Sequence, residues 1–480
     1  MNSSIWKKYK LNLAAMSAFV AWLWIFPLFG ICQANLPGKG SQLITFNYAF
    51  LFGLAMSFLL MLFIRENRLI KLLTCLSPIL NLILTIAIAL ISSLIPPENF
   101  TSPLLSFFVY YFAPVIMGAA TAVYFTSWGT TIFHVPPNEK GRYMGTMILG
   151  ASLTSIIITT VFLFSALPAM LLTGLILFIP AISQQFFNFT ETVKNTPDNY
   201  SVSALLKPWK NFWLPFAFIL LCYYVLSWVT HQSVFPFIRE ENVFAPVLGY
   251  VFYGLISLGA GILLDREEEV EKFALLGLAM LGCTFLFLPV AIKFQILLPL
   301  QFLLEGSYAL IDLFLWVTLA IAACYFQGNP RQYYALGLFL NIAFILAGTG
   351  LTPFLGGQTG EYSFFYLSVF AGIILFAGTI PVRSLRKIKR IPEEKTGLLG
   401  LSEEINNLIN TEDFSIEIFT QKEKEIIYLM LSGFKNTAIE KKLHISRNTL
   451  KTHIRHIYSK AAVKTRSELI LKFHHFKSDI

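Results

Sequence analysis

Gly306-Ser-Tyr-Ala-Leu-Ile-Asp-Leu-Phe-Leu-Trp316 is an apolar stretch whose pattern occurs twice in the chain. The earlier copy is Gly118-Ala-Ala-Thr-Ala-Val-Tyr-Phe-Thr-Ser-Trp128, with glycine and tryptophan at the same separation. Each copy lies in an apolar block long enough to cross a hydrocarbon core as a helix, which needs about 20 residues. Because the copies fall at corresponding places of two sets of blocks, they predict an internal repeat of membrane-spanning helices.

Uninterrupted apolar blocks fill most of the first 382 residues. The chain of 480 residues is 56% hydrophobic and 13% charged, whereas soluble domains carry about 25% charged residues. About twelve blocks have the length of a span, and they lie near 11–32, 44–64, 69–95, 103–127, 144–165, 167–189, 210–232, 246–264, 273–292, 296–326, 333–355 and 362–382. We therefore predict an all-α, polytopic membrane bundle over 1–382, in two six-helix halves separated by the polar stretch 188–210.

Lys and Arg recur in the loops of one side of this predicted bundle. Because cytoplasmic loops are enriched in these residues, that side is predicted to be cytoplasmic. The protein is then expected in the inner (plasma) membrane of a bacterial cell, with the N- and C-termini both inside. The residues that carry this prediction are Lys7, Lys8, Lys10, Arg65, Arg68, Lys71, Lys140, Arg142, Lys194, Lys207, Lys210, Arg266, Lys272, Arg331, Arg383, Arg386, Lys387, Lys389 and Arg390.

The tenth predicted span contains two carboxylates, Glu305 and Asp312, two helical turns apart on one face, with Tyr308 on the same face. Ionisable groups inside a span usually face the bundle interior or a wet cavity. These three residues are candidates for binding a small-molecule ligand or a proton. The alternative is a structural hydrogen bond to a neighbouring helix. Polar and aromatic residues of the first and seventh spans could line the same space, although packing is their commoner role: Trp24, Tyr223, Tyr224, Trp228 and His231.

Two loops on the basic side carry glycine and charged residues in a recurrent pattern. One contains Glu139, Gly141, Arg142 and Gly145, and the other reads Gly261-Ile-Leu-Leu-Asp265-Arg266. They resemble the loop motifs of the major facilitator superfamily, although the second continues as Glu267-Glu-Glu instead of the family's Gly and basic residues. The resemblance implies a twelve-helix transporter-like fold in which the first, fourth, seventh and tenth helices line a central cavity. It also implies that the aspartate of the second motif caps a helix end.

Beyond residue 382 the composition changes to charged and polar residues, which predicts a cytoplasmic linker over 383–415 and a soluble domain over 416–480. Local signals predict four helices in this domain. Thr420 and Glu423 form a capping box for the first helix, and Asn436 caps a second that ends at Leu443. Ser446 caps the third, and Thr465 and Glu468 form the capping box of the fourth.

The third helix of this domain carries a cationic stripe. Arg447, Lys451 and Arg455 are spaced by four residues and therefore share one face. Short polar residues lie beside them: Asn448, Thr452 and Ser459. Such a face suits the major groove of DNA, where Lys and Arg neutralise phosphates or read guanine and Asn reads adenine. A charged stripe on its own is usually only a solvated face, but this one lies on the second helix of a tight pair.

The same segment resembles the LuxR-type helix-turn-helix. The residues that match the family are Thr420, Glu423, Glu425, Leu429, Gly433, Asn436, Ile439, Leu443, Ile445, Ser446, Thr449, Lys451, His453, Ile457, Tyr458, Lys460, Val463 and Arg466. The chain departs from the family at Ala438-Ile-Glu440, at Leu450 and at Ala461-Ala462. The resemblance implies that Thr449 and Lys451 contact the DNA backbone and that two copies of the domain dimerise through the fourth helix. We expect such a homodimer to bind a two-fold promoter site.

A membrane bundle joined to a DNA-binding module indicates a function beyond transport. The first hypothesis is a membrane-anchored one-component transcription regulator, in which the bundle senses an unknown small-molecule ligand. The second is a secondary transporter with a regulatory DNA-binding tail, and the third is a helix-turn-helix that serves protein contacts only. The sequence has no nucleophile–base pair and no nucleotide-binding loop, and its five cysteines lack metal-ligand spacing. We therefore expect no enzyme activity, no cofactor and no metal site.

Overall fold

The structure is a computed structural model, and its described residues fold into helices and connecting turns without a strand. By contact the chain divides into two compact units, Met1–Ile391 and Pro392–Ile480. Residues 386–418, which hold most of the predicted linker, lie outside the described residues. The structure describes residues 3–28, 40–64, 67–94, 102–136, 139–164, 166–186, 202–241, 245–266, 269–294, 296–326, 328–356, 361–385, 419–431, 436–443, 445–461, 463, 465–466 and 468–469.

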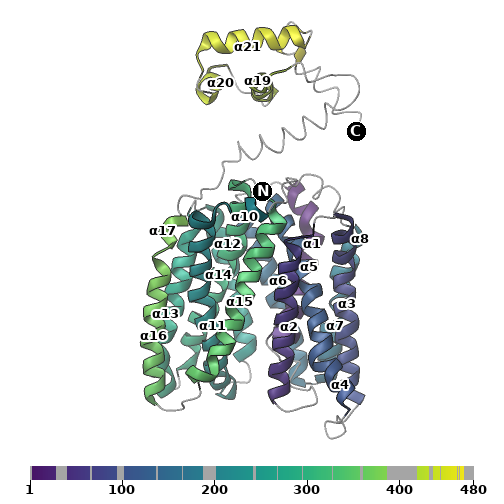
Figure 1. The fold of residues 1–480 in the computed structure, drawn as a ribbon, viewed down its shortest axis with the longest axis vertical. Helices are drawn as coiled ribbons and strands as arrows, with labels where there is room; N and C mark the ends of the chain where they lie inside the picture. Colours follow the sequence, from purple (N-terminus) through teal and green to yellow (C-terminus); the bar gives the residue numbers. More distant parts are fainter. Residues whose placement is uncertain are drawn as a thin grey trace. The chain divides into compact units, whose positions relative to one another are not determined.

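The first half of the membrane unit contains the first six predicted spans (Figure 1). Its elements are α1 (Ser3–Leu23), the π-helical turn η1 (Trp24–Leu28), α2 (Gly40–Met61), α3 (Asn67–Leu94), α4 (Pro103–Phe107), the π-helical turn η4 (Phe108–Phe112), α5 (Ala113–His134), α6 (Lys140–Phe164), α7 (Ala166–Leu175) and α8 (Phe178–Phe186). The block at 103–127 is one continuous run through α4, η4 and α5. The block at 167–189 is interrupted at Ile176 and Leu177, because Pro180 has no N–H with which to continue the preceding helix.

The second half lies beside the first (Figure 1). Its elements are α10 (Val202–Leu206), the π-helical turn η5 (Trp209–Trp213), α11 (Leu214–Glu241), α12 (Ala245–Arg266), α13 (Glu271–Phe294), α14 (Leu297–Tyr325), α15 (Pro330–Gly356), α16 (Glu361–Thr379) and α17 (Val382–Leu385). Over the residues that the structure describes, each of the twelve predicted blocks coincides with a helix or a run of helices. Among the described residues nine helices are long and apolar enough to cross a membrane, and shorter apolar helices cover Thr45–Met61 and Leu171–Ser183.

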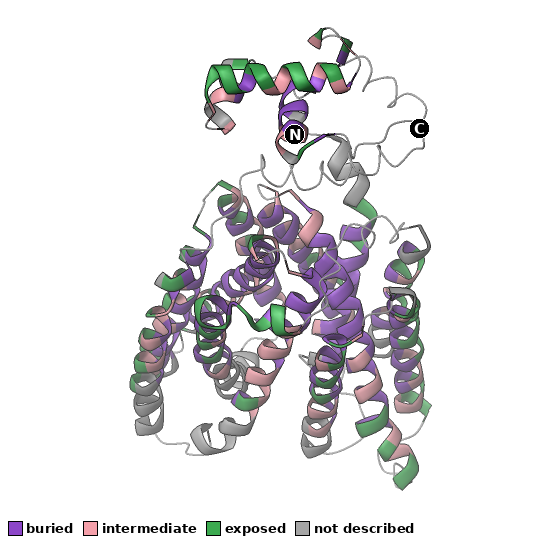
Figure 2. Ribbon diagram, turned by 45° about the horizontal axis from the view of Figure 1, so that its top comes forward, coloured by how far each residue is buried: buried purple, intermediate pink, exposed green. Residues whose placement is uncertain are grey.

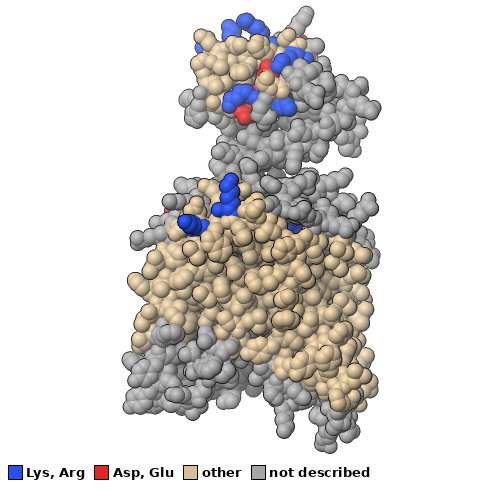
Figure 3. Space-filling view, in the orientation of Figure 1, with Lys and Arg blue, Asp and Glu red and all other residues tan. Residues whose placement is uncertain are grey.

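The outer surface of the membrane unit is apolar. Leu60, Phe63, Leu286 and Phe376 are each more than half exposed, an arrangement that suits contact with lipid tails rather than water. In the space-filling view of Figure 3 the described surface between the two ends of this unit shows no Lys, Arg, Asp or Glu, and blue atoms gather at one end. The chain is a polytopic membrane protein by these features.

Glycines bring α6 of the first half against α12 of the second. A Cβ added at Gly261 would lie 2.2 Å from the carbonyl oxygen of Gly141, and one added at Gly141 would lie 2.4 Å from the carbonyl oxygen of Gly261. A Cβ at Gly145 would lie 2.5 Å from the carbonyl oxygen of Ser257. Side chains have no space at these positions, so the two helices meet backbone to backbone.

Asp265, at the end of α12, completes this contact between the halves. Its Oδ1 accepts a hydrogen bond from the backbone N–H of Gly141 at 2.7 Å, and its Oδ2 accepts one from the N–H of Arg142 at 2.9 Å. Both amides belong to the first turn of α6, which has no intrahelical partners for them and attracts a negative charge. The aspartate of the loop motif therefore caps a helix of the opposite half, as the superfamily resemblance implies.

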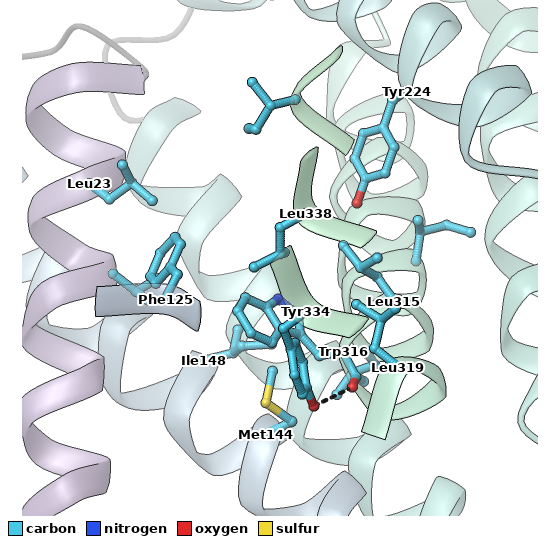
Figure 4. Close-up of a cluster of buried hydrophobic side chains, with 14 of the residues drawn as sticks. Leu23, Phe125, Met144, Ile148, Tyr224, Leu315, Trp316, Leu319, Tyr334 and Leu338 are labelled. Atoms are coloured by element: carbon cyan, nitrogen blue, oxygen red, sulfur yellow. Dashed lines mark hydrogen bonds between the residues drawn. The ribbon is translucent and has the colours of Figure 1, made fainter. Parts of the chain in front are cut away.

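The repeated tryptophans meet at the contact between the halves. The rings of Trp128, from α5, and Trp316, from α14, form an edge contact with centroids 4.8 Å apart. Tyr334 of α15 packs on Trp316 and donates its hydroxyl to the Trp316 carbonyl at 2.9 Å (Figure 4). Two residues before Tyr334, Gln332 donates its side-chain N–H to the carbonyl of Leu62 in the first half at 3.0 Å.

Candidate functional site

The C-terminal unit begins with the predicted capping box. Glu423 accepts a hydrogen bond from the backbone N–H of Thr420 at 2.8 Å, and the Thr420 hydroxyl accepts one from the N–H of Glu423 at 3.4 Å. These bonds satisfy amides at the start of α19 (Gln421–Leu431) that have no partner within the helix. The capping prediction for this helix is confirmed.

Glu423 also joins α19 to a distant helix. Its side chain is 3% exposed, and its Oε2 accepts a hydrogen bond from Lys460 Nζ at 2.6 Å. Burial alone would raise the pKa of this carboxyl, but the hydrogen bonds from Lys460 and Thr420 outweigh it and hold the pKa below its ordinary value. His456 Nδ1 lies 3.9 Å from the other oxygen, Oε1. The carboxylate thus connects the start of α19 with the end of the cationic helix.

A small apolar core holds together the three helices that the structure describes in this unit. It consists of Phe419, Ile426, Ile427, Leu429, Met430, Ile439, Leu450, Ile457, Ala461 and Leu469. Residues from α19, from α20 (Asn436–Leu443) and from α21 (Arg447–Lys460) all contribute to it. Arg466 donates to the carbonyl of Met430 at 2.6 Å, and Thr465 accepts from the N–H of Glu468 at 3.2 Å, as predicted for the fourth capping signal. The remainder of the predicted fourth helix lies outside the described residues.

Ser446 caps α21 as predicted. Its hydroxyl oxygen accepts the backbone N–H of Thr449 at 3.1 Å. One face of α21 is buried, since Leu450 and Ile457 are 1% and 0% exposed. In Figure 2 the opposite face of α21 is coloured as exposed.

All six residues predicted to contact DNA lie on the exposed side of α21: Arg447, Asn448, Thr449, Lys451, Thr452 and Arg455. The three cations among them take part in none of the ion pairs recorded for the described residues. Their charge is therefore available to a polyanion. Two hydroxyls of this face are already engaged: Thr449 shares a hydrogen bond with Ser446, and Thr452 donates to the Asn448 carbonyl.

A second candidate site lies inside the membrane unit, around Asp312 of α14. Tyr224 of α11 donates its hydroxyl to Oδ1 at 2.9 Å, and Tyr253 of α12 donates to Oδ2. The hydrogen bond to neighbouring helices, considered above as the alternative to a ligand role, is therefore present at this residue. The sequence does not reveal this trio, because its members come from three different helices.

The other two candidates on α14 have different surroundings. The Tyr308 hydroxyl donates to the carbonyl of Ser227 at 3.1 Å. A Cβ added at Gly249 of α12 would lie 2.7 Å from Glu305 Oε1, so this carboxylate lies against a place where α12 has no side chain. Glu305, Tyr308 and Asp312 are all half-buried.

Aromatic rings of the first and second halves meet near this site. Trp24, in η1, stacks on Tyr250 with ring centroids 6.0 Å apart and meets Tyr253 edge-on at 5.1 Å. Tyr253 thus contacts both Asp312 and the first half. Among the residues of the seventh span that could line this space, Tyr223 forms a hydrogen bond with Ser307. The side chains of Trp228 and His231 lie outside the described residues.

Comparison with known proteins supports the two parts separately. The family described as bacterial regulatory proteins, luxR family, matches residues 417–473. Over 66 residues the chain is 39% identical to the monoamine regulon transcriptional regulator of Klebsiella aerogenes. The matched segment makes up 14% of this chain and 29% of that protein. The chain thus spans less than a third of the length of such relatives. Its C-terminal part is a LuxR-type helix-turn-helix domain, as predicted.

The membrane unit is similar to solved transporters in fold. The proton:xylose symporter XylE, of the major facilitator superfamily, matches with a TM-score of 0.58 and 12% identity, over 81% of this chain and 96% of that chain. A bacterial homologue of the iron transporter ferroportin, in an outward-facing state, matches with a TM-score of 0.56 and 14% identity, over 78% and 96%. Identities this low show the fold alone, and that fold is major-facilitator-like, as predicted.

Proposed function

Since a LuxR-type DNA-binding domain is joined to a major-facilitator-like bundle, we propose that the chain is a membrane-anchored one-component transcription regulator. The bundle senses a small molecule, and the C-terminal domain binds promoter DNA as a homodimer on a two-fold site. The observation that carries the DNA-binding part is the exposed face of α21, on which Arg447, Lys451 and Arg455 have no acidic partner among the described residues. Phosphate neutralisation by such cations supplies much of the affinity of a protein for DNA.

The ligand site of this proposal is the region of α14 that holds Glu305, Tyr308 and Asp312. In support, the aromatic rings of Trp24 and Tyr253 connect this region with the opposite half of the bundle. A ligand bound there would touch both halves and could therefore bind two arrangements of the halves with different affinities. Such a difference is what a ligand needs in order to shift a population.

The proposed topology has both termini in the bacterial cytoplasm, with the bundle in the inner membrane. It is supported by most of the described cations of the membrane unit, which lie at or near the helix ends of one side, with Lys293 at the other end of α13 as an exception. The cations of the first group are Lys71, Lys140, Arg142, Lys207, Lys210, Arg266, Lys272 and Arg331. This topology gives the C-terminal domain access to DNA. The proposal assigns the chain no catalytic step, because both of its recognised parts are of regulatory or transporter type.

Genome-wide DNA occupancy of the full-length protein in its native membrane tests this function. Thr449→Ala combined with Lys451→Ala is expected to remove discrete promoter peaks, because it removes a backbone contact and a cation from the proposed interface. Lys424→Ala is the matched control, since it removes a cation from α19 and leaves α21 unchanged. Peaks that survive the double substitution, or an absence of peaks in the wild type, would overturn the proposal.

The runner-up function is a secondary transporter with a regulatory DNA-binding tail. The observation that favours it is the fold, which is shared with the proton:xylose symporter over 81% of this chain. Counterflow measurements in proteoliposomes address it directly, using the inducing compound once the regulated genes have suggested one. Accumulation lost in Glu305→Gln would support transport alongside regulation.

A further inference from the structure

α17 is a single helical turn at the point where the chain leaves the last long membrane helix. It lies against α11, α13 and η5. Val382 and Leu385 are 1% and 4% exposed and belong to the core of the membrane unit, whereas Ser384 between them is exposed. Composition assigns Arg383–Leu385 to the linker. In the structure this first part of the linker is docked on the membrane unit.

The surface under α17 is built partly from aromatic residues of η5. Phe212 and Trp213 are both 0% exposed, and the Trp213 indole donates to the carbonyl of Leu205 at 2.7 Å. The ring of Tyr333, from the first turn of α15, lies 5.3 Å from that of Trp213 and 6.1 Å from that of Phe212, centroid to centroid. The element that contacts α17 is therefore packed on the start of α15.

The start of α15 takes part in the contact between the two halves. Gln332 bonds to the Leu62 carbonyl of the first half, and Tyr334 bonds to the carbonyl of Trp316. Trp316 in turn meets Trp128 of the first half. A separation of the halves at this end would break these contacts and displace Tyr333, which lies between Gln332 and Tyr334 in sequence.

A second connection leads from η5 to the middle of the membrane unit. η5 continues directly into α11, which carries Tyr224 and its hydrogen bond to Asp312. A helix rises about 1.5 Å per residue, so Tyr224 lies roughly 16 Å along the helix from Trp213. A continuous helix transmits a displacement over that distance.

We propose that α17 is a docked relay between the membrane unit and the DNA-binding domain. It stays docked while the halves are in contact at the Gln332 and Asp265 positions, and it is released when they separate. Release would extend these four residues to about 14 Å of additional chain and change the reach of the DNA-binding domain. The inference rests on the proposed function and adds the element that links its two parts.

A test that requires no ligand uses substitutions as the input signal. Gln332→Ala with Asp265→Asn removes bonds between the halves, and promoter occupancy of the full-length chain is the output. The pair is expected to change occupancy by at least about fivefold, the lower range of allosteric couplings. Adding Val382→Ser and Leu385→Ser should abolish that change, whereas the exposed control Ser384→Ala should leave it intact. The relay would be overturned if Gln332→Ala with Asp265→Asn, the input pair, left promoter occupancy unchanged. It would also be overturned if the input pair changed occupancy just as much in a chain that carries Val382→Ser and Leu385→Ser.

Cysteine labelling tests docking itself in the full-length chain with its five native cysteines replaced by alanine. In membrane vesicles that expose this face, Leu385→Cys should be protected from an impermeant maleimide and Ser384→Cys should react. Adding the input pair should make Leu385→Cys reactive. Equal labelling at both positions without the input pair would refute docking. Promoter peaks that depend on Lys451 would still stand in that case, so failure of the relay is distinguishable from failure of the proposed function.

Discussion

Trp128 and Trp316, which occupy the same place in the two copies of the sequence repeat, meet edge to face with ring centroids 4.8 Å apart. They are 4% and 9% exposed, and Phe125 and Tyr334 pack on Trp316 from opposite halves. The repeat therefore has a structural meaning, because its matching residues form part of the contact between the halves that it relates.

Trp128 supplies the first prediction. Its indole N–H is buried and has no acceptor among the described residues. Trp128→Phe should therefore be tolerated, because it keeps an aromatic ring against Trp316 and removes an unsatisfied donor. Trp128→Ala should cost about 3–5 kcal/mol by leaving a cavity. Thermal unfolding of the purified protein in detergent ranks the two variants, and equal loss in both would show that the ring contact is unimportant.

The glycines of α12 supply a second prediction with opposite signs. Gly261→Ala should destabilise the contact between the halves by about 1–3 kcal/mol, because its Cβ would collide with the backbone of Gly141. Gly259→Ala, on the same helix, meets no atom within 4 Å. It should leave stability unchanged or raise it by up to about 1 kcal/mol through helix propensity. The apparent melting temperature should fall in Gly261→Ala and should not fall in Gly259→Ala, and an equal fall in both variants would contradict the backbone contact.

Asp312 and Tyr253 supply a third. Tyr253→Phe should destabilise the membrane unit by about 1–3 kcal/mol, since it leaves a half-buried carboxylate with one donor fewer. In a chain that already carries Asp312→Ala, the same substitution should cost much less. Melting temperatures of the wild type, the two single variants and the double variant together form a double-mutant cycle, which measures the coupling between Tyr253 and Asp312. If Tyr253→Phe costs the same in both chains, its hydroxyl does not act through Asp312.

The pH dependence of the C-terminal unit follows from Glu423. The pKa of this carboxyl is lower in the folded state than its ordinary value of 4.5. Its contribution to stability is thus complete above that value and is lost as the pH falls through the lower folded pKa. Glu423→Gln should cost about 2 kcal/mol at neutral pH, between the values for exposed and buried pairs, and nothing at strongly acidic pH.

Amide hydrogen exchange of the α19 segment in the full-length chain, corrected for intrinsic rates, measures this cost. Glu425→Gln is the matched control, because Glu425 makes a partly exposed ion pair with Lys422 and should matter by only a few tenths of a kcal/mol. A cost of Glu423→Gln that does not shrink on acidification would contradict the role of its charge.

Features that depend on neighbouring residues in the sequence were predictable. The bonds of Thr420 with Glu423 and of Ser446 with Thr449 span three residues, and both follow from capping rules. The apolar blocks were recognisable for the same reason, since the length of a span is a local property.

Features that join distant parts of the chain were not predictable from pattern alone. Glu423 and Lys460 are 37 residues apart, and Asp312 lies 88 and 59 residues from Tyr224 and Tyr253. Charge in the sequence suggested a ligand role for Asp312, while the hydroxyls that engage it became visible only with three helices in place. Docking of Leu385 was missed for a related reason, because the basic residues around it outweigh two apolar ones in any compositional measure.

The cap at Ser446 has a consequence for the thermodynamics of DNA recognition. With the Thr449 amide satisfied and the Thr452 hydroxyl bonded to the Asn448 carbonyl, the first turns of α21 are ordered before any DNA arrives. Such a preorganised surface loses little conformational entropy on binding. Association should then lack the large heat-capacity change of coupled folding, and most of its free energy should come from the counterions that leave the DNA.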